Sequence, residues 1–389
     1  MKLWLTFPLL ILLLSCGGDD HMGGPNGTPL TEWTIYGADQ ARTGRAVQAT
    51  LPRETPSVRW QVDLDGESDG SPVLYQKKIY TGAARSIFCL DADSGEVIWE
   101  LNADNNVQSQ FCLFNDRLYV GDDSGNFSAL SPETGETLWS VRLNGDVRSA
   151  PVIADETIYI IDDSGGLYAL KETDGTLIWS KRVFSDVAPA YINGTLYCLT
   201  SSGIAGGPSN SVVAISATDG AERWRTGVRG FAFHTPAIDG DRLLLATNGK
   251  LYALNATTGD ILWDVEVPNQ HEFNSSPAVS NGIVYFGCTS NGGSDVPATV
   301  YAISVSSGEQ IWSSTINQDR FGIHTALVAA DGLLIATGDQ VGVVAFDLLD
   351  GSLVWNFTPN NGFQGASPIV SGNRIYYLDV AGDFYCLEG

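Results

Sequence analysis

The sequence has few basic residues, and after its first sixteen residues it has no long apolar run. Its 389 residues include 21 lysines and arginines against 45 aspartates and glutamates, which gives a formal net charge of −24. Phosphate binding needs a basic surface, so nucleic acid is excluded as a partner. No later apolar run is long enough for a transmembrane helix. These features predict a secreted, soluble body, although its acidity does not identify a ligand.

Cysteine is scarce and is not arranged for a disulfide framework. Six cysteines are present, and no two of them are adjacent or form a Cys-x-x-Cys motif. Cys16 belongs to an amino-terminal motif, which leaves an odd number for the body of the protein. Cys89 and Cys386 occupy a position that is alanine in other copies of a repeat, so we expect buried core thiols there. We therefore predict no disulfide bonds.

Histidine is equally rare, and no set of residues resembles a catalytic nucleophile with its base. His21 lies in an amino-terminal tether, whereas His234 and His324 occupy matching positions one residue before two predicted inner strands. A metal site would need further ligands that converge on the same point. We expect these two histidines to form hydrogen bonds near one mouth of a central channel. We predict no catalytic residue and no metal.

The sequence is rich in one unit, a glycine followed four residues later by a tryptophan. The steps from one tryptophan to the next are 40, 40, 45, 39, 49 and 43 residues, a period typical of repeat architectures. The glycine supplies the positive φ of a tight turn, and a half-buried strand follows it. Each indole can bury roughly 150–250 Å², but one strand alone cannot stay folded, so blades must pack together and bury the indoles between them. The pairs are Gly95/Trp99, Gly135/Trp139, Gly175/Trp179, Gly220/Trp224, Gly259/Trp263, Gly308/Trp312 and Gly351/Trp355.

An eighth tryptophan strand, around Trp60, has no repeat before it. The carboxy-terminal end supplies three strands, near 367–370, 374–378 and 383–387, and then the sequence ends without a tryptophan strand. The simplest account is that the Trp60 strand completes the last blade, which leaves no open sheet edge. We predict an all-β, eight-bladed β-propeller with four-stranded antiparallel blades over residues 33–389.

Two acidic segments could suggest calcium, which takes oxygen ligands. They are Asp122-Asp-Ser-Gly-Asn126 and Asp162-Asp-Ser-Gly165. Both fall between the second and third strands of a predicted blade, a position that favours hairpin turns. We therefore predict turns here rather than metal loops.

The amino terminus predicts export and a lipid anchor. Residues 1–15 combine one lysine with a short apolar run, as in a secretory signal peptide. Leu13-Leu14-Ser15-Cys16 resembles a bacterial lipobox, which implies cleavage before Cys16 and lipidation of that residue. Residues 16–32 then form a flexible tether. The motif implies attachment to the outer membrane, facing either the periplasm or the cell surface.

The repeat Ala253-x-Asn255-x-x-Thr258-Gly259-Asp260-x-x-Trp263 closely resembles that of the pyrroloquinoline-quinone (PQQ) propeller superfamily. Eight such blades behind a lipobox resemble the BamB family of outer-membrane lipoproteins. That resemblance implies a non-catalytic scaffold without a cofactor, whose partner is a BamA-like barrel-assembly protein.

Two other functions stay open at this stage. One is a surface-exposed lipoprotein that binds protein or glycan. The other is a PQQ-dependent dehydrogenase, a class that usually has an adjacent cysteine pair, a calcium site and an aspartate base; no adjacent cysteine pair is present here.

The loops that enter the inner strands contain a candidate partner-binding rim. Blades four to eight carry a phenylalanine there, whereas blades one to three carry Glu67, Asn106 and Asp146. Phenylalanine beside arginine is typical of interface hot spots, and long loops 201–210 and 289–297 should rise from the same rim. The alternative is that these rings wedge between blades and are buried. The candidate residues are Phe184, Phe231, Phe273, Phe321, Phe363, Arg229, Arg320, His234 and His324.

Overall fold

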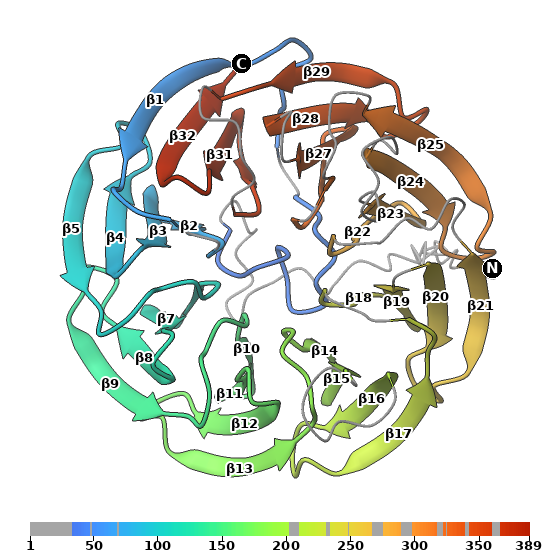
Figure 1. Ribbon diagram of the computed structural model, residues 1–389, viewed down its shortest axis with the longest axis horizontal. Helices are drawn as coiled ribbons and strands as arrows, with labels where there is room; N and C mark the ends of the chain where they lie inside the picture. Colours follow the sequence, from blue (N-terminus) through green and yellow to red (C-terminus); the bar gives the residue numbers. More distant parts are fainter. Residues whose placement is uncertain are drawn as a thin grey trace, which may run out of the picture.

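Eight four-stranded antiparallel sheets stand in a ring around a central axis (Figure 1). The fold is therefore the predicted eight-bladed β-propeller. Among the described residues, no helix is long and apolar enough to cross a membrane. The computed structural model describes residues 33–46, 49–67, 70–201, 210–230, 234–247, 249–266, 275–288, 298–316, 322–323, 325–338, 342–359 and 366–389.

Each blade runs from an inner to an outer strand. Blade 1 contains β2 (Val73–Tyr75), β3 (Lys78–Ala83), β4 (Ser86–Asp91) and β5 (Val97–Asn102). Blade 2 contains β6 (Cys112–Phe114), β7 (Arg117–Gly121), β8 (Asn126–Leu130) and β9 (Thr137–Arg142). Blade 3 contains β10 (Val152–Ala154), β11 (Thr157–Ile161), β12 (Gly166–Lys171) and β13 (Leu177–Arg182). Blade 4 contains β14 (Ala190–Ile192), β15 (Thr195–Thr200), β16 (Ser211–Ser216) and β17 (Glu222–Gly227).

The second half of the ring repeats this order. Blade 5 contains β18 (Ala237–Asp239), β19 (Arg242–Thr247), β20 (Lys250–Asn255) and β21 (Ile261–Glu266). Blade 6 contains β22 (Ala278–Ser280), β23 (Ile283–Cys288), β24 (Ala298–Ser304) and β25 (Gln310–Ile316). Blade 7 contains β26 (Val328–Ala330), β27 (Leu333–Gly338), β28 (Gly342–Asp347) and β29 (Leu353–Phe357). Blade 8 contains β30 (Ile369–Ser371), β31 (Arg374–Leu378) and β32 (Asp383–Glu388), with β1 (Ser57–Asp63) outermost.

The two ends of the chain close the ring, as the sequence predicts. Strand β1 pairs antiparallel with β32, and Trp60 lies opposite Cys386 in the register. The indole of Trp60 stacks on Phe384, with 5.8 Å between the ring centroids. An ion pair between Arg59 and Glu388, 2.6 Å from nitrogen to oxygen, adds to the same seam. The last blade is therefore built from both termini of the propeller.

The tryptophans of the repeat are less buried than the sequence predicts, and the expectation that every indole is enclosed between blades is wrong. Of the eight, only Trp312 and Trp355 are buried. The reason is that they belong to outer strands, whose residues alternate between exposed and half-buried because one face looks outward. The half-buried tryptophans are Trp60, Trp99, Trp139, Trp179, Trp224 and Trp263.

These half-buried indoles still link neighbouring blades. The indole nitrogen of Trp99 in blade 1 donates to the backbone oxygen of Pro132 in blade 2 at 3.0 Å. That of Trp139 in blade 2 donates to the backbone oxygen of Glu172 in blade 3 at 3.2 Å. These indoles thus bond one blade to the next at the perimeter of the disc.

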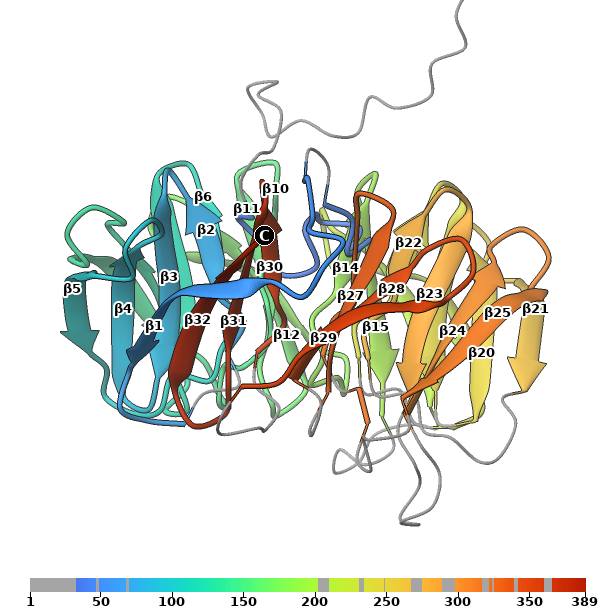
Figure 2. The same cartoon turned by 90° about the horizontal axis from the view of Figure 1, so that it is seen from above.

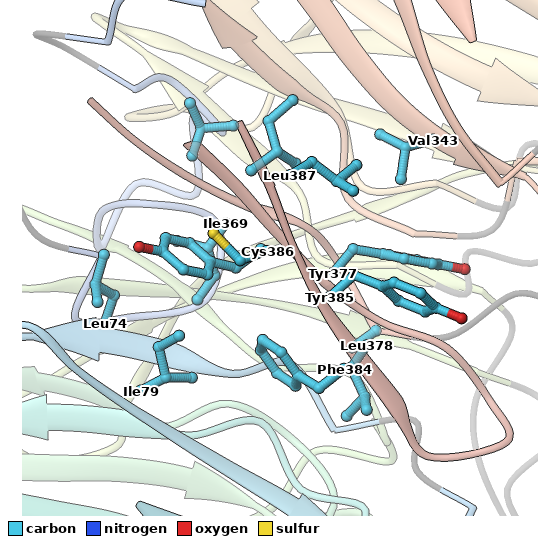
Figure 3. Close-up of a cluster of buried hydrophobic side chains, with 14 of the residues drawn as sticks. Leu74, Ile79, Val343, Ile369, Tyr377, Leu378, Phe384, Tyr385, Cys386 and Leu387 are labelled. Atoms are coloured by element: carbon cyan, nitrogen blue, oxygen red, sulfur yellow. The ribbon is translucent and has the colours of Figure 1, made fainter. Parts of the chain in front are cut away.

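The apolar core is divided into layers between successive blades. Figure 3 shows the cluster on both sides of blade 8, in which Leu74 and Ile79 of blade 1 lie near Ile369 and Phe384 of blade 8 and Val343 belongs to blade 7. The five cysteines of the described region are all buried and free, as predicted. Cys16 lies outside the described residues. Burial raises the pKa of each described thiol to about 12, so these cysteines behave as core residues.

Residues 33–46 form a strap across the centre of the disc, a role the sequence analysis did not predict. Figure 1 shows this blue segment crossing the middle of the ring. Its backbone and one side chain form hydrogen bonds with the innermost strands of seven blades in order. Thr50, just after the strap, forms one with the turn that follows β30 of blade 8. The bonded pairs are Trp33–Leu74, Thr34–Leu113, Gln40–Ile153, Gln40–Tyr191, Ala41–Ile238, Thr43–Val279, Gly44–Ala329 and Thr50–Gly372.

Arg42 lies at the centre of the strap and is only 1% exposed. Its guanidinium donates to the backbone oxygens of Tyr36 at 2.5 Å, Pro151 at 3.1 Å, Ala150 at 3.3 Å and Pro189 at 3.4 Å. Burial lowers the pKa of Arg42 to about 10, because removal from water disfavours the charged form. Carbonyl groups of two blades and of the strap itself thus surround one buried cation.

Candidate partner-binding rim

The predicted rim is one face of the disc. Strands alternate in direction, so the loops between blades and the turns between second and third strands emerge on the same side. In Figure 2 this is the lower face, whereas the strap lies toward the upper face. The rim and the strap are therefore on opposite faces. Trp33, the first described residue of the strap, bridges Leu74 of β2.

Phe184 is the one phenylalanine of the candidate set that the structure describes. It follows β13 with a φ of 59°, and its ring is half-buried. The guanidinium of Arg182 lies 4.7 Å from the ring centroid, a cation–π contact. The backbone nitrogen donates to Gly165 at 3.0 Å, and the backbone oxygen accepts from Ser201 at 2.8 Å. The backbone is thus fixed while part of the ring stays accessible.

Arg229 and His234 lie on the next loop of the same rim, between β17 and β18. Arg229 is exposed, and its backbone nitrogen donates to the hydroxyl of Tyr252 at 2.9 Å. His234 is half-buried at the start of an inner strand segment and has a bonding partner. The structure thus places both residues on the same rim as Phe184, one loop between blades further along the ring. The remaining candidates, Phe231, Phe273, Phe321, Phe363, Arg320 and His324, lie outside the described residues.

The polar part of the rim, over blades 1 to 3, contains a network of charged side chains. Arg148 contacts Asp123 at 2.7 Å and Asp146 at 3.1 Å. Burial raises the pKa of Asp146, and the neighbouring charge of Asp163 adds to this effect. The backbone nitrogen of Asp146 also donates to the Asp163 carboxylate at 2.9 Å. This side of the rim is therefore acidic and tied together by one arginine.

The two acidic segments form hairpin turns, as predicted. The carboxylate of Asp122 accepts from the backbone nitrogens of Ser124 and Asn126, and the Asp162 carboxylate accepts from that of Gly166. These bonds hold the turns between the second and third strands. Within the described ranges, no three His, Cys, Asp or Glu side chains converge as metal ligands.

On the acidic side of the rim, a cavity of about 290 Å³ lies between blades 1 and 2. Ser128 of β8 and Ser140 of β9 line it, together with Asp104 from the loop between these blades. The sequence analysis did not select these residues. The one available signal is that Ser128 departs from the pattern of the third strands.

The family model described as "Outer membrane protein assembly factor BamB" matches residues 83–207, 185–320 and 296–388. BamB of Yersinia pestis is 30% identical over 204 residues, 49% of this chain and 49% of that protein. Tetrathionate hydrolase of Acidithiobacillus ferrooxidans is 26% identical over 186 residues, 43% of this chain and 36% of that protein. The chain thus aligns with about half or less of these relatives' own length.

Two solved structures share the fold. BamB from Moraxella catarrhalis superposes with a TM-score of 0.68 and 18% identity, covering 86% of this chain and 100% of that one. Quinohemoprotein alcohol dehydrogenase from Comamonas testosteroni superposes with a TM-score of 0.76 and 14% identity, covering 92% and 80%. These identities establish the architecture alone. Because the family model matches most of residues 83–388, the chain belongs to the BamB family of PQQ-type β-propellers.

Proposed function

We propose that the protein is a non-catalytic scaffold in outer-membrane β-barrel protein assembly, anchored by a lipid on Cys16. The observation that carries the proposal is the BamB family match from residue 83 to residue 388. The partner is a BamA-like barrel-assembly protein, which the scaffold holds through the rim.

The position of the strap supports this arrangement. The predicted tether of residues 16–32 precedes the strap in the sequence, and the strap lies on the face opposite the rim. A membrane anchor on that side leaves the rim directed away from the lipid surface. The partner would then bind the loops beside Phe184 and Arg229, where aromatic and basic side chains occur together.

A rigid body suits a scaffold. Ring closure through β1 and β32, together with the strap, fixes the blades relative to one another. Little entropy is then lost when a partner binds a preformed surface. The experiment is chemical crosslinking of intact membranes followed by purification of this protein. Recovery of the barrel-assembly protein supports the proposal, and its absence from the crosslinked material refutes it.

The rim itself is tested by exchange of Phe231 and Phe321 for serine. Partner capture should fall while the melting temperature stays within a few degrees of the parent. Phe184→Ser extends the test to a ring that the structure describes as half-buried. A fall in melting temperature without a separate loss of binding would instead assign the rings to packing between blades.

Two alternatives are separable by simple measurements. The similarity to an alcohol dehydrogenase fold and to a tetrathionate hydrolase favours testing for quinoprotein chemistry. Cofactor absorbance or alcohol-dependent dye reduction, after addition of PQQ and calcium, would identify such an enzyme. A surface-exposed lipoprotein that binds protein or glycan would be cut by protease added to intact cells, whereas a periplasmic one would not.

A further inference from the structure

One blade departs from the rule by which the layers between blades are filled. In each third strand, the residue before the small Ala or Cys position points into the layer shared with the preceding blade. In seven blades it is bulky and buried within that layer's apolar cluster. These residues are Phe88, Tyr168, Val213, Tyr252, Tyr301, Val344 and Tyr385. In blade 2 the equivalent residue is Ser128.

The cavity of about 290 Å³ between blades 1 and 2 lies where this bulky side chain is missing. Ser128 lines it and bonds to the hydroxyl of Ser140 across the strand pair at 2.9 Å. One wall is apolar and includes Ile87, Leu101 and Leu130. This volume is at the small end for a ligand pocket, so it suits one side chain rather than a large cofactor.

Another edge of the same cavity is acidic. Asp104 is exposed there, and Asp122 is 7% exposed. Asn126 bridges them, because its amide donates to Asp122 at 2.9 Å and to Asp104 at 3.3 Å. The described lining residues include no lysine or arginine. The nearby Arg85 donates to the backbone oxygen of Asp104 and is not part of the lining.

We propose that this cavity binds an arginine side chain presented by the protein partner, an inference that rests on the scaffold function proposed above. The methylene stem of arginine would cover the apolar wall, and its guanidinium would meet the acidic edge. An anionic group is disfavoured by the two carboxylates, and a purely apolar side chain would cover the buried Asp122 without giving it a counter-charge. The net charge of −24 also favours a basic partner segment.

The test uses the full-length protein and N-acetyl-arginine N-methylamide as the probe, with binding followed by NMR titration. Ser128→Tyr fills the cavity with the side chain that blades 3, 5, 6 and 8 carry at this position, so the fold is expected to persist. Ser128→Ala is the matched control, because it removes the hydroxyl and keeps the space. Asp104→Asn removes one charge from the edge, and Asp186→Asn on another exposed loop is its control.

Saturable binding to the parent and to Ser128→Ala is expected, with affinity about tenfold or more lower for Ser128→Tyr and for Asp104→Asn. The uncharged citrulline counterpart should bind at least tenfold more weakly than the arginine probe. No saturable binding to the parent, or equal binding to Ser128→Tyr, overturns the proposal.

Capture of the barrel-assembly protein separates this inference from the function on which it rests. Reduced capture by Ser128→Tyr relative to Ser128→Ala supports the arginine contact. Equal capture by both variants overturns that contact and leaves the scaffold function standing. If the parent binds the probe but captures no barrel-assembly protein, the scaffold function fails and the cavity remains a guanidinium site.

Discussion

A Cβ atom on Gly95 would lie 2.7 Å from the indole of Trp60, although the two residues belong to neighbouring blades at the seam of the ring. The indole nitrogen of Trp60 donates to the backbone oxygen of Ala92 in the same turn, at 3.1 Å. The glycine of each repeat thus supplies the positive φ of its own turn. Because it has no Cβ, it also leaves space for the tryptophan of the preceding blade. This relationship explains why the two residue types recur together.

Gly259→Ala should destabilise the protein more than Gly240→Ala. Both glycines have positive φ, 78° and 59°, so both substitutions carry a backbone cost of about 1–2 kcal/mol. A Cβ at position 259 would also lie 2.6 Å from Trp224, whereas nothing lies within 4 Å at position 240. Overpacking adds about 1–3 kcal/mol to the loss at position 259. Urea unfolding measures the free energy of unfolding of both variants. Equal losses would contradict the claim that Gly259 leaves space for the indole of Trp224.

Trp60→Ala should lower the free energy of unfolding by about 3–5 kcal/mol, as should Trp179→Ala inside the ring. Both indoles are half-buried and donate to the next blade at 3.1 Å. In a closed ring the two substitutions should therefore cost a similar free energy of unfolding. In an open arrangement the Trp60 strand would fray, and its substitution would have little effect. Chemical denaturation of the two variants side by side distinguishes these outcomes.

Arg42→Met should lower the melting temperature and expose the centre of the disc. The substitution removes donors from the backbone oxygens of Tyr36, Pro151 and Pro189 and leaves buried acceptors without partners. Each unsatisfied group costs about 1–3 kcal/mol. Gln40→Met is a partial control, because it removes only one such bond, to Ile153. Similar stability of both variants would show that the strap adds little.

Stability should fall as pH rises above about 9. Burial raises the pKa of the core thiols from 9.0 to about 12, and that of Tyr159 and Tyr285, among others, from 10.0 to about 12. A group with a raised folded pKa contributes stability below its unfolded pKa and loses it toward the folded value. Arg42 acts in the opposite direction, but as a single group.

Tyrosinate absorbance and circular dichroism, recorded together from pH 8 to pH 12, check this expectation. Most buried tyrosines should ionise only as the sheet signal is lost. Gradual ionisation with the sheet signal intact would contradict it.

Much of the fold follows from the sequence because every repeat has the same pattern of a tight turn followed by a tryptophan strand. The spacing of glycine and tryptophan fixes the blades, and the unpaired Trp60 strand implies closure with β32. The strap escapes prediction because residues 33–46 carry no periodic signal, and their partners come from seven different blades. Burial of indoles such as those of Trp99 and Trp139 is overestimated from sequence, because the outer position of their strands depends on the ring.

The candidate site was harder to predict than the fold. Phe184, Arg229 and His234 do share one rim, since the strand order places equivalent loops on one face. The importance of Ser128 depends on knowing that its position faces the preceding blade. That knowledge comes from the register of β8 against β9 and from the clusters between blades.

Site-specific photocrosslinking in intact cells tests the central claim most directly. A photoreactive amino acid is placed at Phe184 or Arg229 on the rim, and at Leu349, which is 85% exposed in a turn on the opposite face. The scaffold account predicts adducts with the barrel-assembly protein from the rim positions and none from position 349. Adducts from position 349 alone, or no adduct from either rim position, would contradict it.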